Sequence, residues 1–149
     1  MSLDHIRLST QAKEQLIRLK RATGIKNWNV LCRWALCVSL ADETPPTDKK
    51  IVADSSVEMS WKIFGGPHQE VYLALLKQRC KQDVNDTSSE VLAQVFKLHL
   101  HRGIAILASD RTIKSISSLL NRSIPPGSER RSGDSRTRHD LFPQSVNGT

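Results

Sequence analysis

The chain has 149 residues, a formal net charge of +7 and a hydrophobic fraction of 38%. This length fits a single domain, and no segment has the roughly 18 consecutive apolar residues that a membrane-spanning helix needs. The start of the chain lacks the apolar stretch of a signal peptide. The three cysteines form no Cys-x-x-Cys pair, so we expect no disulfide framework and a cytoplasmic location.

The first forty residues follow the order strand, helix, glycine turn, helix. Residues 5–9 alternate between polar and apolar, which predicts a short strand. Residues 11–21 and 28–40 predict two helices, and Gly24 between them suits the left-handed backbone that ends a helix. This order is that of a ribbon-helix-helix unit, in which two chains pair their strands into a ribbon that can read DNA.

Short polar side chains predict where several helices begin. Ser9 or Thr10 offers a hydroxyl to cap the first helix, and Asn27 can cap the second. The run from Thr87 to Glu90 has the pattern of a capping box, in which both side chains bond to main-chain amides of the first turn.

Most of the positive charge lies in the same N-terminal segment. Residues 1–40 carry seven Lys or Arg against Asp4 and Glu14, a net +5 of the total +7. Such clustering is typical of a surface that meets phosphate backbones. The alternative is a solvated helix surface, because Glu14 and Arg18 are spaced as an i, i+4 pair. The candidate DNA-contacting residues are Arg7, Lys13, Arg18, Lys20, Arg21 and Lys26.

The second helix is apolar on nearly every side, and only Asn29 and Arg33 form a thin polar strip. Such a helix must be buried, and a chain of this size can hardly bury it on every side alone. We therefore expect part of this helix, including Trp34, to lie in a contact between subunits. The alternative is a central helix that later helices of the same chain surround.

A small β-hairpin is predicted after a linker that contains Pro45 and Pro46, which forbid helix. Residues 57–63 alternate between apolar and polar, as a half-buried strand does. Residues 50–53 are a plausible partner strand, and Gly65 follows where the pattern ends.

Three further helices are predicted. Residues 70–82 form the third, and a long fourth helix follows, in which Gly103 predicts close packing against another backbone. The fifth begins near Ser109 and Asp110 and stops before Pro125. In the third helix we expect Val71, Leu75 and Leu76 to face inward and Lys77, Arg79 and Lys81 to face outward.

The composition changes at residue 125 to mainly Gly, Ser, Arg, Pro and Asp, which offers little apolar area to bury. We therefore expect residues 125–149 to be a disordered basic tail and residues 1–124 to form one domain. The predicted fold class is mainly α, a ribbon-helix-helix-like core with a small β-hairpin and additional C-terminal helices.

No group of residues predicts an active site, a metal site or a cofactor. His99 and His101 would lie about 200° apart around a helix, so they cannot bind one ion from the same side. Cys32 and Cys37 would likewise lie about 140° apart, and Cys80 belongs to another helix. Buried, unreactive thiols are therefore expected.

Five stretches of this sequence resemble the DndE family. They are residues 6–9 (IRLS), 20–25 (KRATGI), 28–35 (WNVLCRWA), 57–66 (VEMSWKIFGG) and 72–80 (YLALLKQRC). The WNVLCRW stretch is the specific part of this likeness.

The resemblance implies a bacterial protein of DNA sulfur modification, in which sulfur replaces a non-bridging phosphate oxygen to give phosphorothioate DNA. It implies a ribbon-helix-helix-like homotetramer that binds double-stranded DNA and prefers nicked duplex. It also implies partner proteins of the same machinery, among them a cysteine desulfurase, an iron–sulfur enzyme and an ATPase. The resemblance carries over no catalytic residue.

Two other functions stay open. The first is a scaffold whose basic surface meets acidic patches of partner proteins and has little affinity for DNA. The second is a ribbon-helix-helix transcription regulator. Only His5, Arg7 and Ser9 would point outward from its ribbon, and that set offers few donors for reading base edges.

Overall fold

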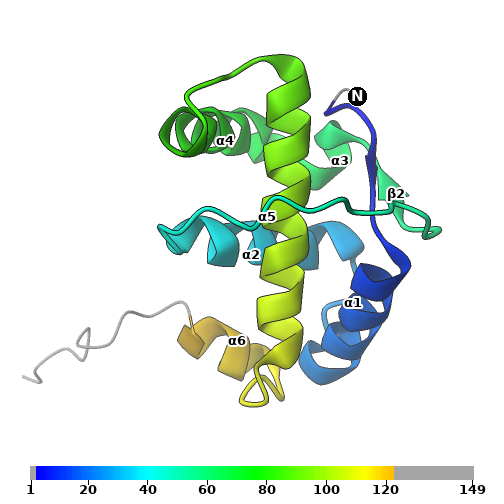
Figure 1. The fold of residues 1–149 in the computed structure, drawn as a ribbon. Helices are drawn as coiled ribbons and strands as arrows, with labels where there is room; N and C mark the ends of the chain where they lie inside the picture. Colours follow the sequence, from blue (N-terminus) through cyan, green and yellow to red (C-terminus); the bar gives the residue numbers. More distant parts are fainter. Residues whose placement is uncertain (1–2, 123–149) are drawn as a thin grey trace, which may run out of the picture.

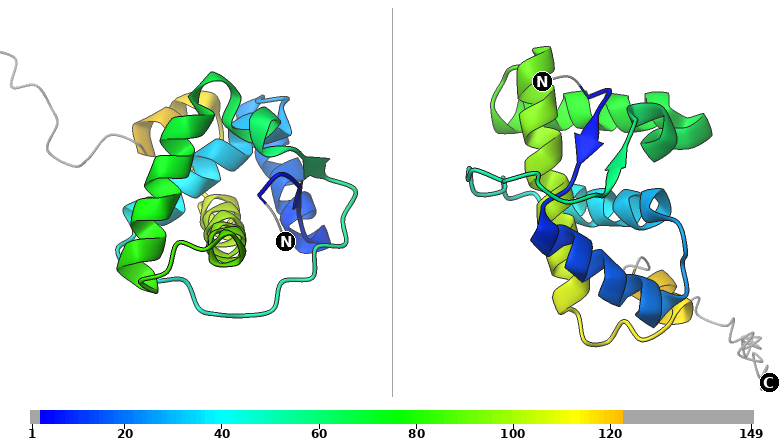
Figure 2. Two further views of the ribbon diagram at one scale, coloured as in Figure 1. Left: turned by 90° about the horizontal axis from the view of Figure 1, so that it is seen from above. Right: turned by 90° about the vertical axis from the view of Figure 1, so that its right-hand side faces the viewer.

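The long helix α5 (Ser89–Ser109) lies at the centre of the fold in the computed structural model, which describes residues 3–122 (Figure 1). Seen end on in Figure 2 (left), α5 is surrounded by helices and by the irregular segment 42–57. The surrounding helices that contact it are α1 (Thr10–Thr23), α2 (Trp28–Ala41) and α4 (Gln69–Asp83). By length and composition α5 could cross a membrane, but 11 of its 21 residues are buried, as in the core helix of a globular domain. The described residues share one hydrophobic core.

The closest helix crossing joins α2 to α5. A Cβ atom added at Gly103 would stand only 1.8 Å from the carbonyl oxygen of Ala35. Only glycine allows the two backbones to approach so closely. The close packing that the sequence predicted at Gly103 is therefore confirmed, and its partner is α2.

The central helix of the chain is α5 rather than α2. One side of α2 packs on α5 and is buried along Leu31, Ala35 and Leu36. On the opposite side Trp34 is half-buried and Cys37 is exposed. Trp34 still packs against the core, so the chain's own residues cover this side of the helix only in part, and the contact between subunits expected there stays a prediction.

The small sheet joins the N-terminal strand to a strand that lies about 50 residues later in the chain. β1 (Ile6–Arg7) pairs antiparallel with β2 (Glu58–Met59), and Ile6 lies opposite Met59. The predicted β-hairpin is therefore wrong, because residues 50–53 form no strand. The ladder is continued by Leu8, whose N–H donates to the carbonyl of Val57 over 3.1 Å.

The strand predicted over residues 57–63 ends early because a helix starts inside it. The Ser60 hydroxyl accepts a hydrogen bond from the N–H of Ile63 and caps α3 (Trp61–Gly65). Helical spacing places Trp61 and Phe64 on one side, where their rings pack on Phe96 with centroids 5.3 and 5.1 Å away. A strand would have buried Ile63 instead, which is 57% exposed.

The remaining helices lie close to their predicted ranges, although their starts differ. A 3₁₀ turn, η1 (Gly66–His68), leads into α4, and α6 (Ile116–Arg122) begins later than expected, after a turn held by Asp110. The predicted capping box does not form, since α5 is preceded by Ser88, whose side chain makes no capping bond. The predicted tail 125–149 lies outside the described residues.

Helix α4 is rotated relative to the prediction. Val71 and Leu75, expected inside, are 57% and 41% exposed, whereas Arg79, expected outside, is 6% exposed. Leu76 is fully buried, as expected. The physical reason is a set of carbonyl groups at and just after the end of α2, to which the guanidinium of Arg79 donates.

Candidate nucleic-acid interface

The six candidate residues lie on β1, on α1 and on the turn that follows α1. The Ser9 hydroxyl caps α1 by accepting from the N–H of Ala12 over 3.1 Å, as predicted. The buried stripe of α1, which includes Leu16 and Leu19, faces the core, and α1 contacts α5. Gly24 ends the helix with φ +75°, and its N–H bonds to the carbonyl of Lys20. The helix therefore turns its charged side chains away from the core.

Three of the six candidates are free cations on this outer surface. Arg18, Arg21 and Lys26 are exposed. Within the described chain, none of them donates a side-chain hydrogen bond or forms an ion pair. Glu14 does not pair with Arg18, although the sequence spacing allows it. These charges are available to an anion without breaking a contact of the fold.

The other three candidates have partners inside the chain. The guanidinium of Arg7 donates to Glu58 over 2.9 Å, and this hydrogen bond lowers the pKa of the Glu58 carboxyl. Lys13 Nζ donates to the hydroxyl of Ser56 over 2.7 Å. Lys20 Nζ lies 3.9 Å from the ring centroid of Trp28, at a distance typical of a cation–π contact. Of the six, Arg7 is the least available to DNA, because an ionised carboxylate already balances its charge.

Two further cations extend this surface, and the sequence analysis missed them. Arg111 and Lys114 are exposed on the turn before α6, and α6 packs against α1. They lie about 90 residues from α1 in the chain, so no local pattern could reveal their proximity. The outer surface of α1 and this turn together define a basic surface made of Arg18, Arg21, Lys26, Arg111 and Lys114.

The family model described as DNA sulphur modification protein DndE matches residues 5–115 of this chain. The chain belongs to the DndE family. The match covers most of the described domain, including both strands, α1, α2 and the aromatic cluster around α3. Family membership implies involvement in DNA phosphorothioation.

Two solved structures of DndE proteins are similar in fold. The crystal structure of DndE from Escherichia coli B7A, described as involved in DNA phosphorothioation modification, is 25% identical with a TM-score of 0.60. The likeness covers 72% of this chain and 98% of that one. The DndE G21/24K mutant is 23% identical with a TM-score of 0.53, over 70% of this chain and 95% of that one. No curated protein sequence matches this chain.

For a DndE-family protein, the state of the thiols bears on where sulfur chemistry takes place. Burial raises the pKa of Cys32 to about 12 and that of Cys80 to about 11. Cys37 is the one exposed thiol of the described residues, and partial desolvation of its sulfur by the surrounding chain raises its pKa as well. At neutral pH all three are protonated thiols, which are poor nucleophiles for sulfur transfer.

A Ser-His-Asp set is present in the core, but it is a structural link. The carboxylate of Asp83 can only accept, so His99 Nε2 carries the proton and donates to it over 3.1 Å. In the neutral ring Nδ1 then accepts from the Ser39 hydroxyl over 2.8 Å, and the same hydroxyl accepts from Arg102 Nε. Ser39 and His99 are both 0% exposed, so no substrate reaches this hydroxyl.

The buried Arg79 and the half-buried Arg102 complete the link and hold the end of α2. Arg79 donates to the carboxylate of Asp83 and to the carbonyls of Leu40, Asp42 and Thr44, over 2.6–3.1 Å. Arg102 donates to the carbonyls of Ser39 and Thr44. The last carbonyls of a helix lack partners within the helix, and here two arginines supply them. We call this set, Ser39, Arg79, Asp83, His99 and Arg102, the polar link.

Proposed function

We propose that this chain is a non-catalytic DNA-binding accessory subunit of the bacterial DNA phosphorothioation system. It contacts the phosphate backbone of duplex DNA through the basic surface on α1, and the sulfur chemistry is carried out by partner proteins in the cytoplasm. The observation that carries this proposal is the set of free, exposed cations Arg18, Arg21 and Lys26. The raised pKa values of the thiols support the assignment of sulfur transfer to partners.

A homotetramer fits the same proposal. Val30, Trp34 and Cys37 leave an incompletely covered apolar side on α2. Assembly of several copies would repeat the basic surface around the DNA, so that weak phosphate contacts add up.

The same proposal predicts that the protein prefers nicked duplex, because the DNA must bend to contact several subunits of the tetramer. Bending a short intact site by 40–90° costs on the order of 1–6 kcal/mol. A broken strand lowers that cost, so the nicked duplex binds more tightly.

The test is a titration of the full chain with one intact and one nicked duplex, compared with two double variants. Arg18→Gln with Arg21→Gln removes two charges from the basic surface. Lys77→Gln with Lys81→Gln removes two exposed charges from α4 and is the matched control. We expect the first variant to bind both duplexes about tenfold more weakly or worse, and the control to bind as the wild type does.

A second candidate function is a protein scaffold with little affinity for DNA. Three exposed apolar side chains on α3 and α4 favour it, namely Ile63, Val71 and Leu75. If pure duplex does not bind the wild type at low salt, this second function replaces the first.

A further inference from the structure

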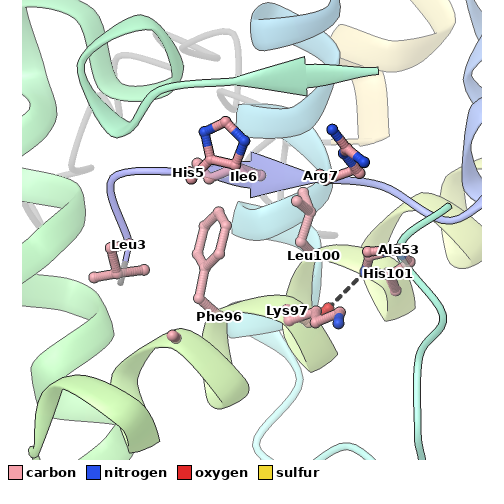
Figure 3. A pocket seen from close by; sticks show the side chains of 10 residues that line it. Leu3, His5, Ile6, Arg7, Ala53, Phe96, Lys97, Leu100 and His101 are labelled. Atoms are coloured by element: carbon pink, nitrogen blue, oxygen red, sulfur yellow. Dashed lines mark hydrogen bonds between the residues drawn. The ribbon is translucent and has the colours of Figure 1, made fainter. Parts of the chain in front are cut away.

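A groove lies between β1 and α5, on the side of β1 that faces away from β2 (Figure 3). Its volume is about 430 Å³. Figures 2 (right) and 3 both place β1 between β2 and α5. The floor is apolar and is formed by Leu3, Ile6, Ala93, Phe96 and Leu100.

The outer edge of β1 points into this groove. The N–H of Leu8 bonds toward β2, so the main-chain groups of Arg7, one residue earlier, point the other way. The N–H of Ser9 confirms this direction, because it donates to Nε2 of His101, which lines the groove, over 3.1 Å. No hydrogen bond of the described chain uses the Arg7 main chain outside the β1–β2 pairing. The main-chain N–H and C=O of Arg7 are therefore open to an added strand.

The rim of the groove is positively charged. Lys97 forms no ion pair with any described residue. Lys49 lies close enough to His101 to affect its titration, together with Lys97. His101 is not itself a cation, since Nδ1 donates to the carbonyl of Lys97 and Nε2 accepts from Ser9. The available charges are those of Lys97 and Lys49, and Arg7 shares its charge with Glu58.

We propose that this groove binds a short extended segment of a partner protein in which apolar and acidic residues alternate, and that the segment pairs with the outer edge of β1. Main-chain hydrogen bonds to Arg7 give affinity, as in other cases of strand addition. Because side chains alternate along a strand, apolar ones enter the groove and acidic ones face Lys97 and Lys49.

Charge complementarity decides between this occupant and a second copy of the chain. A second β1 (Ile6–Arg7) carries no acidic side chain that could meet Lys97 and Lys49, and its Arg7 is already paired with Glu58, so a second copy gains nothing from the charge of the rim. An acidic segment instead gains from the same charges. The site is also separate from the basic surface on α1, so it does not depend on DNA binding.

The test starts from a displayed library of random linear heptapeptides selected on the full-length protein. We expect the enriched peptides to alternate apolar and acidic residues. Lys97→Glu should weaken a selected peptide about tenfold, the scale of one lost ion pair plus a repulsion. Lys77→Glu makes the same charge change on α4, which does not line the groove, and should leave binding unchanged. Failure to enrich any peptide, or equal binding to Lys97→Glu, overturns the proposal.

Two further measurements keep the result independent of folding and of the other occupants. Hydrogen exchange of the Arg7 amide should slow when the peptide binds, and Ala53→Trp, which fills the groove without changing charge, should abolish binding. If the peptide dissociates an oligomer, the groove is a contact between copies. If duplex DNA displaces the peptide and Lys97→Glu weakens both equally, the groove is a nucleic-acid site. Either of these last two results overturns the proposal.

Discussion

The arginines of this chain fall into two groups with opposite environments. Arg18 and Arg21 on α1 are exposed and form no side-chain hydrogen bond or ion pair with the described residues, whereas Arg79 is buried and donates four hydrogen bonds. Arg102 is half-buried and donates three hydrogen bonds. The cost of removing water from a guanidinium explains the difference, because a buried charge must be fully paired. The inner arginines therefore hold the fold, and the outer ones are available to a ligand.

The largest effect should come from the inner group. Arg79→Ala removes the charged donor from Asp83 and from the carbonyls of Leu40 and Asp42, while His99 still donates to Asp83 and Arg102 still donates to Thr44. Breaking a buried pair in this way costs about 3–5 kcal/mol. Urea unfolding followed by circular dichroism measures this loss. A variant within about 1 kcal/mol of the wild type would show that water replaces the guanidinium at little cost.

The pH dependence of stability sharpens the same contrast, because His99 belongs to the polar link. Burial, more than the nearby arginines, lowers the pKa of His99 below its ordinary value of 6.5, and burial lowers that of His101 as well. The unfolded chain thus binds protons more tightly than the folded one, so stability is complete above pH 6.5 and falls as the pH drops below it. The slope should approach about 1.4 kcal/mol per pH unit for each histidine.

Urea unfolding at several values between pH 8 and pH 5 measures this slope, and His99→Gln should flatten it. An equal free energy of unfolding at pH 7.5 and pH 5.5 would contradict the neutral, buried state of both rings.

Lys20 is an intermediate case, since its ammonium lies over Trp28 but is still partly exposed. Lys20→Ala should cost about 0.5–1 kcal/mol through the lost cation–π contact, and Lys20→Arg should restore most of it. Thermal unfolding of the wild type, Lys20→Ala, Lys20→Arg and the control Arg21→Ala gives the comparison. If Lys20→Ala and Arg21→Ala have the same melting temperature, the contact with Trp28 contributes nothing.

The smallest effect on stability belongs to the outer group. Arg18→Gln with Arg21→Gln should change the free energy of unfolding by no more than about 0.5 kcal/mol, as is usual for exposed side chains without partners. Urea unfolding of this variant and of Arg79→Ala shows whether the outer and inner arginines differ in their contribution to the free energy of unfolding. A loss of about 2 kcal/mol or more in the outer variant, the scale of a removed core contact, would show that these arginines stabilise the fold.

Local signals in the sequence predicted the elements that depend on local chemistry. The Ser9 cap, the left-handed Gly24 and the tight approach at Gly103 each follow from one residue type and its neighbours. The family resemblance, carried by stretches such as residues 28–35, is also confirmed. A strand around residues 58–59 was also predicted, but its pairing with β1 was not, because residues 6 and 59 meet only in the folded chain.

Long-range packing also explains the wrong orientation of α4. Val71 and Leu75 look like core residues and Arg79 looks like a surface residue when the helix is considered alone. The carbonyls that Arg79 satisfies belong to residues 40, 42 and 44, which no pattern within α4 reveals. The same limit hid Arg111 and Lys114, which join the basic surface only because α6 packs against α1.

The most direct test of the account is the salt dependence of duplex affinity for the wild type and for Arg18→Gln with Arg21→Gln. Each neutralised phosphate contributes about −0.9 to the slope of log affinity against log salt concentration. The account predicts a steep slope for the wild type, reduced by about 1.8 for every subunit that contacts the DNA in the variant. If the Arg18→Gln, Arg21→Gln double variant has the same slope as the wild type and as the Lys77→Gln, Lys81→Gln control, the claim that the outer arginines of α1 bind phosphate is contradicted.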